Sequence, residues 1–280
     1  MIKPLVSVVI PTYNRSFQLT EAIDSVQNQS FTDWELIIID DGSEENTEDI
    51  IPKDHRITYK RISHTGLPGK VRNEGVRLTN ANWIAFLDSD DIWSPDKLIT
   101  QMNYLRTHLD CKIVHTRETW QRNNKIISQR KMKHKREGDI FEDSLDKCII
   151  GPSTVLLSRE LYLALGGFDE SIEIAEDYEF WLRITAKYEV GYIDEPLVIK
   201  KAGDWEQLST KYGQIEIFRI KALQGLIDRQ YFNRTHDKLA RKVMAYKCRI
   251  YGKGALKRGH QDTYKKYMSL ASSYSEEGLV

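Results

Sequence analysis

The sequence has no net charge, few cysteines and no long hydrophobic run. Its 41 basic and 41 acidic side chains sum to zero, which excludes a generic nucleic-acid binder or a polybasic membrane binder. Three widely separated cysteines support neither a disulfide framework nor a CxxC zinc site, so we expect reduced thiols in a cytosolic protein. No stretch approaches eighteen apolar residues, so any membrane contact is expected to be peripheral.

Proline and glycine are also scarce, at 7 and 16 residues, and 40% of the chain is hydrophobic, as in a folded protein. Short apolar runs at 5–10, 34–39, 57–62 and 83–87 alternate with helix-period segments over the first hundred residues. One helix is expected to run from Pro68 to about Leu78, and Ser94-Pro95 has the pattern of an N-cap and first helical position. This alternation predicts an α/β fold with a mainly parallel sheet.

Polar clusters follow the first, second and fourth expected strands, at the sheet edge where ligands bind in open α/β folds. Asp88 and Asp90 lie two positions apart at a strand end, and carboxylates there suit Mg²⁺ or Mn²⁺ that keeps open positions for phosphate oxygens. The alternative is an ordinary Asp/Ser turn whose carboxylates cap a helix.

The second cluster, Asp40-Asp41, is either a capping turn or a site that accepts hydrogen bonds from a nucleoside, with Tyr13 as a stacking surface. Lys70 and Arg72 do not form a P-loop, because the glycine spacing is wrong and Val71 follows the lysine. A basic residue on the first turn of this helix still suits a diphosphate.

Glu176-Asp177 precedes a segment in which Phe180, Trp181 and Ile184 suit one helix face. Asp177 is therefore expected near a helix N-terminus, where the dipole favours an ionised carboxylate that can act as a general base. The alternative is a plain N-cap.

Two strongly basic regions stand out in the second half of the chain. Eight basic residues and one acid lie between 117 and 136, in a β-prone stretch with a hairpin at 122–125, which predicts a solvated ribbon or a flap facing phosphate. From residue 211 the chain is mostly helix-period and has a net charge of about +9, which leaves about −9 for the rest. This tail is either a solvated helical surface or one that meets an anionic acceptor or membrane.

Taken together, these clusters resemble the family-2 inverting glycosyltransferases with the GT-A fold. Four segments match that family in type, order and spacing: Val6-Ser-Val-Val-Ile-Pro-Thr-Tyr-Asn14, Ser30-Phe-Thr-Asp-Trp-Glu-Leu-Ile-Ile-Ile-Asp-Asp-Gly-Ser43, Gly69-Lys-Val-Arg-Asn-Glu-Gly75 and Ile84-Ala-Phe-Leu-Asp-Ser-Asp-Asp91. The match is strong over 4–97, moderate over 151–209 and weak thereafter. The resemblance implies a mostly parallel Rossmann-like sheet in a catalytic domain over 1–210, with a basic helical extension over 211–280.

The resemblance also implies a role for individual residues. The nucleotide would be met by Pro11, Tyr13, Asp40, Asp41, Arg72, Asp88 and Ser89, and the acceptor by Gly151, Glu176 and Trp181. Asp177 matches the catalytic base, and Asp90 matches the ligand of a Mn²⁺ or Mg²⁺ ion. Asp204 stands where the family usually has a histidine that completes the metal site, so it is either a second, hard-oxygen ligand with altered metal preference or only a loop residue.

The expected activity is metal-dependent, inverting transfer of a sugar from a nucleotide sugar, with UDP favoured, to a hydroxyl of a glycan or lipid-linked acceptor. The sequence lacks the Gln-x-x-Arg-Trp signature of processive synthases, which favours single addition in polysaccharide or cell-envelope biosynthesis. The alternatives are a sugar-nucleotide-binding module without turnover and a nucleotidyltransferase, although the latter is expected to have a Gly-rich loop after the first strand. The implied location is the cytoplasm or the inner membrane face.

Overall fold

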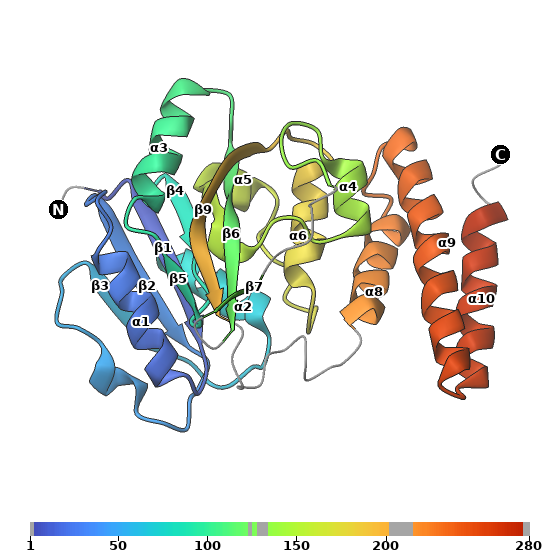
Figure 1. The fold of residues 1–280 in the computed structure, drawn as a ribbon, viewed down its shortest axis with the longest axis horizontal. Helices are drawn as coiled ribbons and strands as arrows, with labels where there is room; N and C mark the ends of the chain where they lie inside the picture. Colours follow the sequence, from blue (N-terminus) through green and yellow to red (C-terminus); the bar gives the residue numbers. More distant parts are fainter. Residues whose placement is uncertain (1–2, 123–124, 128–133, 202–214, 277–280) are drawn as a thin grey trace.

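The computed structural model describes residues 3–122, 125–127, 134–201 and 215–276. Over these residues one mixed sheet of nine strands has the order β3-β2-β1-β4-β8-β6-β9-β5, with β7 paired to β6 (Figure 1). Its parallel half consists of β1 (Val6–Thr12), β2 (Trp34–Asp40), β3 (Ile57–Arg61) and β4 (Trp83–Phe86). The predicted parallel α/β core is therefore confirmed.

The rest of the sheet is mostly antiparallel. Its strands are β5 (Asp91–Trp93), β6 (Ile113–Arg122), β7 (Lys125–Ile127), β8 (Val155–Ser158) and β9 (Gly191–Lys201). Strand β8 runs antiparallel to β4 and β6, while β9 is parallel to β6 and antiparallel to β5. The expected hairpin is confirmed by the pairing of Arg122 with Lys125 and Trp120 with Ile127.

Helices cover both faces of the sheet. They are α1 (Ser16–Gln27), α2 (Pro68–Leu78), α3 (Lys97–Thr107), α4 (Phe141–Asp146), α5 (Arg159–Ala164) and α6 (Glu176–Thr185), with short 3₁₀ turns η1 (Thr47–Ile50) and η2 (Pro152–Thr154). Alternate residues of β1 explain the two layers: Val8 belongs to the apolar cluster shared with α1 and α3, and Val9 to the cluster shared with α5 and α6. Both faces of the strand are buried, as in a parallel sheet between helices.

The predicted start of α3 is wrong by a few residues. Ser94 and Pro95 were expected to cap the helix, but the helix begins at Lys97 after Asp96. The preceding residues 91–93 pair with β9 as strand β5, and the Ser94 amide donates to the carbonyl of Leu197. Because this sheet pairing is made with residues a hundred positions away, local helix signals did not reveal it.

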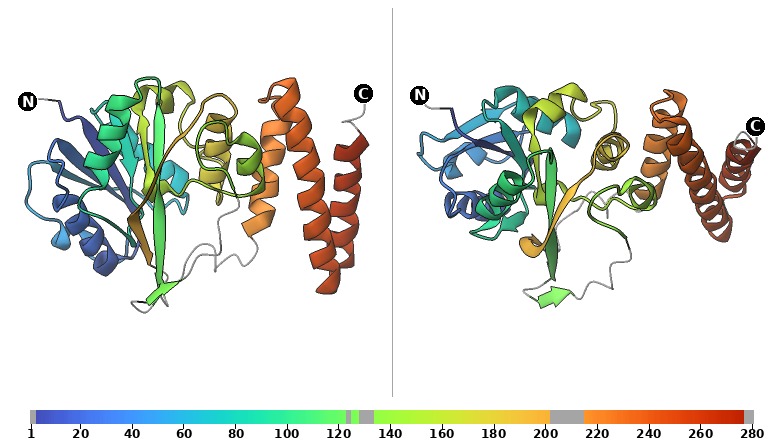
Figure 2. Two further views of the ribbon diagram at one scale, coloured as in Figure 1. Left: turned by 45° about the horizontal axis from the view of Figure 1, so that its top comes forward. Right: turned by 90° about the horizontal axis from the view of Figure 1, so that it is seen from above.

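Three helices form a layer at one end of the molecule: α8 (Ile215–Asp228), α9 (Arg234–Lys257) and α10 (Gln261–Glu276). Both views in Figure 2 keep them at the end opposite β2 and β3. They share one apolar cluster with α4 and α6, to which Tyr178 and Leu182 of α6 contribute. The predicted boundary at 210/211 lies outside the described residues, and α8 packs directly against the helix that contains Asp177.

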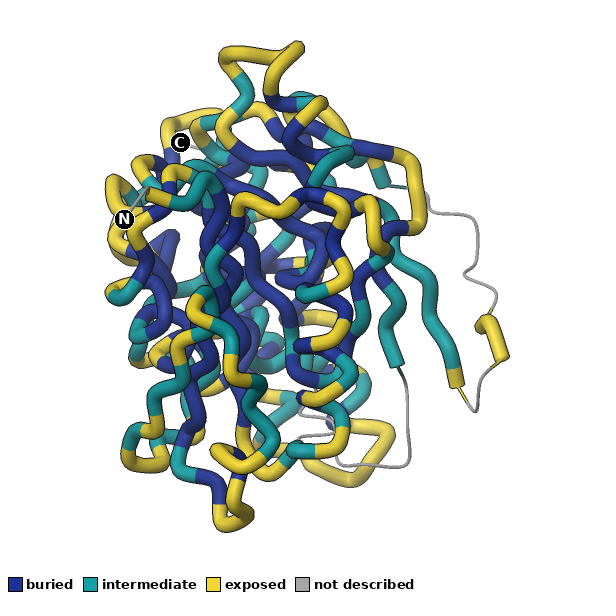
Figure 3. Tube along the Cα trace, turned by 90° about the vertical axis from the view of Figure 1, so that its left-hand side faces the viewer, coloured by how far each residue is buried: buried dark blue, intermediate teal, exposed yellow. Residues whose placement is uncertain are grey.

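Burial decreases from the sheet outward. Figure 3 shows the central strands as buried, whereas β7, the short piece between two grey stretches, is exposed. No helix among the described residues combines the length and the apolar composition needed to cross a membrane.

Candidate active site

A cavity of about 1000 Å³ opens where β1, β2 and β4 end. Register brings these ends together, because Thr12 pairs with Asp40 and Val9 with Phe86. Ten of the predicted site residues line this cavity: Pro11, Tyr13, Asp41, Arg72, Asp88, Ser89, Asp90, Gly151, Glu176 and Asp177. Asp40 and Trp181 do not line it, and Asp204 lies outside the described residues.

Arg72 joins two parts of the cavity wall that are far apart in the sequence. Its Nη2 donates to Asp88 Oδ1 at 2.7 Å, and its Nη1 donates to Glu176 Oε1 at 2.5 Å. Gly69, one turn earlier, permits this approach, since a Cβ there would lie 3.1 Å from Glu176 Cγ. The close contact between α2 and α6 thus explains Gly69 and Arg72 of the matching segment 69–75.

Burial and charge act in opposite directions on this ion-pair network. Burial would lower the pKa of Arg72, but Asp88 and Glu176 raise it overall. Burial would raise the pKa of Asp88, but Arg72 and Lys200 hold it below its usual value. For Glu176 burial dominates and, together with the neighbouring Asp177, raises the pKa to about 7 despite Arg72.

Asp177 lies in the first turn of α6, as predicted. Its Oδ1 accepts from the amide of Tyr178 at 2.7 Å, and the thiol of Cys148 lies 3.5 Å from Oδ2. Ala175, which precedes the helix, has φ 68°, a left-handed conformation that is uncommon for a residue with a Cβ. The carboxylate is therefore held at the cavity wall by an unusual turn, a backbone amide and the field of the helix N-terminus.

The acidic cluster after β4 has a separate partner for each carboxylate. Asp90 Oδ2 accepts from Arg15 at 2.6 Å, and Asp91 Oδ2 accepts from Ser153 at 2.5 Å. Lys200 Nζ lies 3.7 Å from Asp91 Oδ2. Burial, with repulsion from Asp88 and Asp90, nevertheless raises the pKa of Asp91 to about 8.

The side chains in the cavity that could bind a metal ion, Asp88 and Asp90, offer carboxylate oxygens. Among the described residues no group of three or more His, Cys, Asp or Glu side chains is arranged to hold an ion. Asp88 and Asp90 do face one cavity, and Mg²⁺ and Mn²⁺ are often held by one or two carboxylates plus phosphate oxygens and water. The residues therefore fit an ion that arrives with a diphosphate.

The two aspartates at the end of β2, Asp40 and Asp41, have different roles. Asp40, predicted to contact the nucleotide, is instead fully buried: it accepts from the Ser43 amide and the Tyr59 hydroxyl, both at 2.8 Å. Asp40 does not reach the cavity because it is still within β2, and its side chain closes the turn to Ser43. Asp41, one residue later, lines the cavity.

Asp41 also organises the loop that follows β3. Its Oδ1 accepts from the Thr65 amide and hydroxyl at 2.9 Å, and its Oδ2 accepts from the Gly66 amide at 2.8 Å. His64 Nδ1 lies 3.1 Å from Asp41 Oδ2, and the His64 ring stacks on Tyr13 at 4.1 Å. His64 was missed in the sequence, because nothing local indicates that it meets Tyr13.

Trp181 was predicted on the acceptor side, but it is 2% exposed and packs against Phe168 and Phe180 in the core. The reason is its depth along α6: only the start of the helix, at Glu176 and Asp177, lines the cavity, and Trp181 lies one turn further along, among apolar side chains of the core. Gly151 does line the cavity, and a Cβ there would lie 3.0 Å from Glu118 Oε2.

Several cavity residues come from parts of the chain where sequence reasoning named none. Lys147, Lys200 and Arg219 line the wall from the end of α4, from β9 and from α8. The basic stretch at 117–136 is only partly solvated, since His134 and Arg136 line this cavity too.

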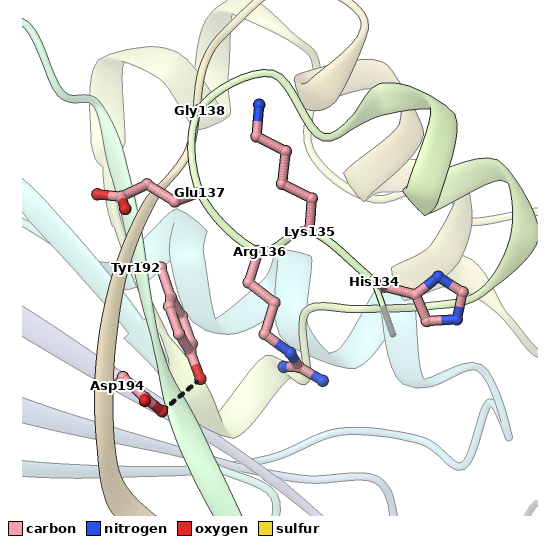
Figure 4. Close-up of a pocket in the computed structure, with 7 residues that line it drawn as sticks. All are labelled: His134, Lys135, Arg136, Glu137, Gly138, Tyr192 and Asp194. Atoms are coloured by element: carbon pink, nitrogen blue, oxygen red, sulfur yellow. Dashed lines mark hydrogen bonds between the residues drawn. The ribbon is translucent and has the colours of Figure 1, made fainter. Parts of the chain in front are cut away.

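A second hollow, of about 490 Å³, shares His134 and Arg136 with the first. Figure 4 shows the residues that line it, with the Tyr192 hydroxyl donating to Asp194 at 3.1 Å.

Comparisons with known proteins identify the same family that the sequence motifs resemble. The model of Glycosyl transferase family 2 matches residues 7–166. TuaG from Bacillus subtilis (strain 168), a putative teichuronic acid biosynthesis glycosyltransferase, is 32% identical over 190 residues, 66% of this chain and 73% of TuaG. WfgD from Escherichia coli, a UDP-Glc:alpha-D-GlcNAc-diphosphoundecaprenol beta-1,3-glucosyltransferase, is 30% identical over 199 residues, 70% of this chain and 76% of WfgD. An uncharacterized glycosyltransferase from Rickettsia conorii is longer: the 32% identical match covers 69% of this chain but 32% of that relative.

Solved structures show the same fold at low sequence identity. TarS 1–349 of S. aureus in complex with UDP-GlcNAc has a TM-score of 0.68 at 17% identity, covering 98% of this chain and 92% of the 1–349 chain. The mannosyltransferase PcManGT from Pyrobaculum calidifontis, in complex with GDP-Man and Mn²⁺, has a TM-score of 0.59 at 15% identity, covering 98% and 86%. The predicted GT-A fold is confirmed, and the chain belongs to glycosyl transferase family 2.

Proposed function

We propose that this protein transfers a sugar, with inversion, from a UDP-sugar to a hydroxyl of a cell-envelope glycan or its lipid-linked precursor. One observation supports this above the others: the Asp177 carboxylate shares a single cavity with Tyr13, Asp41, Arg72 and Asp88. A base and a nucleotide site in one cavity are what sugar transfer requires. The names of TuaG, WfgD and TarS support the donor class and the envelope setting.

The donor would lie along the strand ends. The base would stack on Tyr13 beside Pro11 and donate hydrogen bonds toward Asp41, and the ribose would meet Asp88 and Ser89. Arg72 would place its positive charge beside the diphosphate. In this role Asp41 contacts the nucleobase and also holds the 64–66 loop against it.

On the acceptor side, Asp177 would remove the proton from a hydroxyl held near Gly151 and Glu176. The hydroxyl oxygen forms a bond to the anomeric carbon while the bond from that carbon to the diphosphate oxygen breaks. Entry opposite the leaving group inverts the configuration. Because Asp177 acts on the attacking hydroxyl and not on the anomeric carbon, no covalent intermediate is needed.

Asp90, with Asp88 beside it and Asp204 as a second ligand, would hold Mn²⁺ or Mg²⁺. The bound ion supplies positive charge to the departing nucleoside diphosphate.

A thermal-shift screen of UDP-, GDP- and dTDP-sugars with and without Mn²⁺ tests the donor and the ion together. Binding to the folded state raises the melting temperature, and we expect UDP-sugars with Mn²⁺ to give the largest rise. Asp90→Ala should remove the Mn²⁺-dependent part, whereas Asp110→Ala, an exposed aspartate after α3, should behave as the unmodified protein. No shift with any nucleotide sugar would contradict the proposed function.

We also propose a peripheral membrane contact, on the cytoplasmic side, through α9. Residues 238–257 contain no acidic residue, and exposed side chains at helical spacing form one face: Lys242, Tyr246, Arg249, Ile250, Lys253, Leu256 and Lys257. Cations mixed with exposed apolar side chains suit an anionic bilayer surface.

Cosedimentation with vesicles tests this contact. We expect binding to phosphatidylglycerol-containing vesicles, little binding to phosphatidylcholine alone, and loss of binding in Lys242→Glu/Lys253→Glu. The matched control is Lys53→Glu/Lys112→Glu, which reverses two exposed lysines elsewhere. Equal binding by all three proteins would show that the α9 face is only solvated.

A further inference from the structure

Arg219 of α8 lines the cavity with an unusually poor set of partners. Its side chain is 18% exposed, and within the part of the chain that the structure describes its one ion pair is Nη1 to Glu216 Oε2 at 3.5 Å, the limit of a hydrogen bond. The Nε atom is buried with no hydrogen-bond partner among the described residues. The other oxygen of Glu216 is already engaged by Lys247 at 2.6 Å.

Two more deeply buried arginines, Arg72 and Arg183, have short contacts to carboxylates, although the Nε of Arg72 also has no hydrogen-bond partner among the described residues. Arg72 has two carboxylates, and Arg183 has Glu179 at 2.8–3.0 Å plus the carbonyls of Leu165 and Gly167. Burying a guanidinium without equivalent partners is costly, because the lost hydration is not replaced. Arg219 therefore has donors available for an anion that enters the cavity.

The position of Arg219 places that anion near the candidate base. Its Cζ lies 5.9 Å from the ring centroid of Tyr178, the residue after Asp177. Cys148 lines the same wall and contacts Asp177 Oδ2 at 3.5 Å. In Figure 1, α8 lies beside α6, at the end of the molecule away from β2, where the nucleotide would bind.

The surrounding wall combines positive charge with apolar surface. Lys147, which is exposed at the end of α4, adds a second cation to the same cavity. Ile149, Ile174 and Ile215 line it as well. A ligand that suits this wall has an anionic group next to a hydrocarbon segment.

We infer that Arg219 and Lys147 bind the phosphate of a lipid-linked acceptor, next to the sugar whose hydroxyl faces Asp177. This inference rests on the proposed function, and it names the chemical class of the acceptor: a sugar ester of a lipid phosphate or diphosphate. It also gives the C-terminal helices a direct part in the site, since α8 supplies the guanidinium.

The test is a calorimetric titration of the full chain with geranyl diphosphate, with and without saturating UDP and Mg²⁺. We expect binding that Arg219→Gln weakens about tenfold or more, the usual size of a lost charge-assisted pair, while UDP affinity stays unchanged. Lys147→Gln should weaken it less. Lys221→Gln, an exposed lysine of the same helix that does not line the cavity, is the matched control and should have no effect.

Three further ligands show which part of geranyl diphosphate the site binds. Pyrophosphate alone should bind more weakly than geranyl diphosphate, because it makes no apolar contacts, and geraniol should not bind through Arg219. Geranic acid tests a carboxylate: if it depends on Arg219 and geranyl diphosphate does not, the phosphate assignment is wrong. If Arg219→Gln fails to fold by circular dichroism, Arg219→Lys replaces it, with an intermediate loss expected because an ammonium cannot donate two parallel bonds.

The outcomes also separate this inference from the proposed function. UDP binding together with Arg219-independent geranyl diphosphate binding, or with none, overturns the acceptor-phosphate site and leaves the proposed donor site standing. No UDP binding, with Arg219-dependent geranyl diphosphate binding, overturns the acceptor role of the site and the proposed function.

Discussion

Replacing Asp177 with Asn is expected to lower kcat by about a thousandfold or more while UDP affinity changes by less than about twofold. Asn has the same shape and retains an oxygen that can accept from the Tyr178 amide, so the turn at the start of α6 should persist. It cannot take a proton from the acceptor hydroxyl. Steady-state kinetics with UDP-sugar and calorimetric titration with UDP measure the two effects.

Asp228→Asn is the matched control, because it makes the same change at an exposed position at the end of α8. Full transfer by Asp177→Asn would remove Asp177 from the role of base. Glu176, whose pKa is about 7, is then the next carboxylate to test by Glu176→Gln.

Replacing Arg72 with Leu is expected to destabilise the fold by about 3–5 kcal/mol and to abolish transfer. The change leaves Asp88 and Glu176 in the cavity wall without the cation that now bonds to both. Urea unfolding at pH 7 measures the loss. Arg77→Leu, on the same helix, is the matched control: Arg77 is 54% exposed, so losing its pairs with Glu74 and Glu170 should cost less than about 1 kcal/mol.

The pH dependence of the free energy of unfolding gives a second measurement on Arg72→Leu. The pKa of Glu176 is about 7 when folded, against 4.5 for the free side chain, so the folded state holds a proton that the unfolded state has released. That contribution to stability is fully present below about pH 4.5 and is lost as pH rises through about 7. Without Arg72 this pKa rises further, so the stability of Arg72→Leu should keep falling above about pH 7, where that of the unmodified protein levels off. Parallel curves would contradict the assigned role of Arg72.

The parts of the site that follow strands directly could be predicted from sequence. Tyr13, Asp41 and Asp88 each come just after an apolar run, and parallel strands bring such positions to one edge. Asp40 and Trp181 show the limit of this reasoning. One position along β2 separates buried Asp40 from cavity-lining Asp41, and one turn along α6 separates Asp177 from buried Trp181; residue type alone did not settle either case.

Contacts between distant segments could not be predicted. His64 meets Tyr13 because the loop after β3 folds back onto Asp41, and β5 exists only because β9 lies beside it. Arg219 lies in a helix whose sequence reads as an ordinary amphipathic segment. Its place in the cavity wall follows from the packing of α8 on α6, which the sequence pattern does not encode locally.

Proton NMR of the sugar first released or transferred from an α-linked UDP-sugar tests inverting transfer by Asp177. A single base that activates an attacking oxygen predicts a β-configured product at the earliest time points, before mutarotation. The Asp177→Asn variant should not form this β-configured product. An α-configured first product would contradict inverting transfer from this cavity.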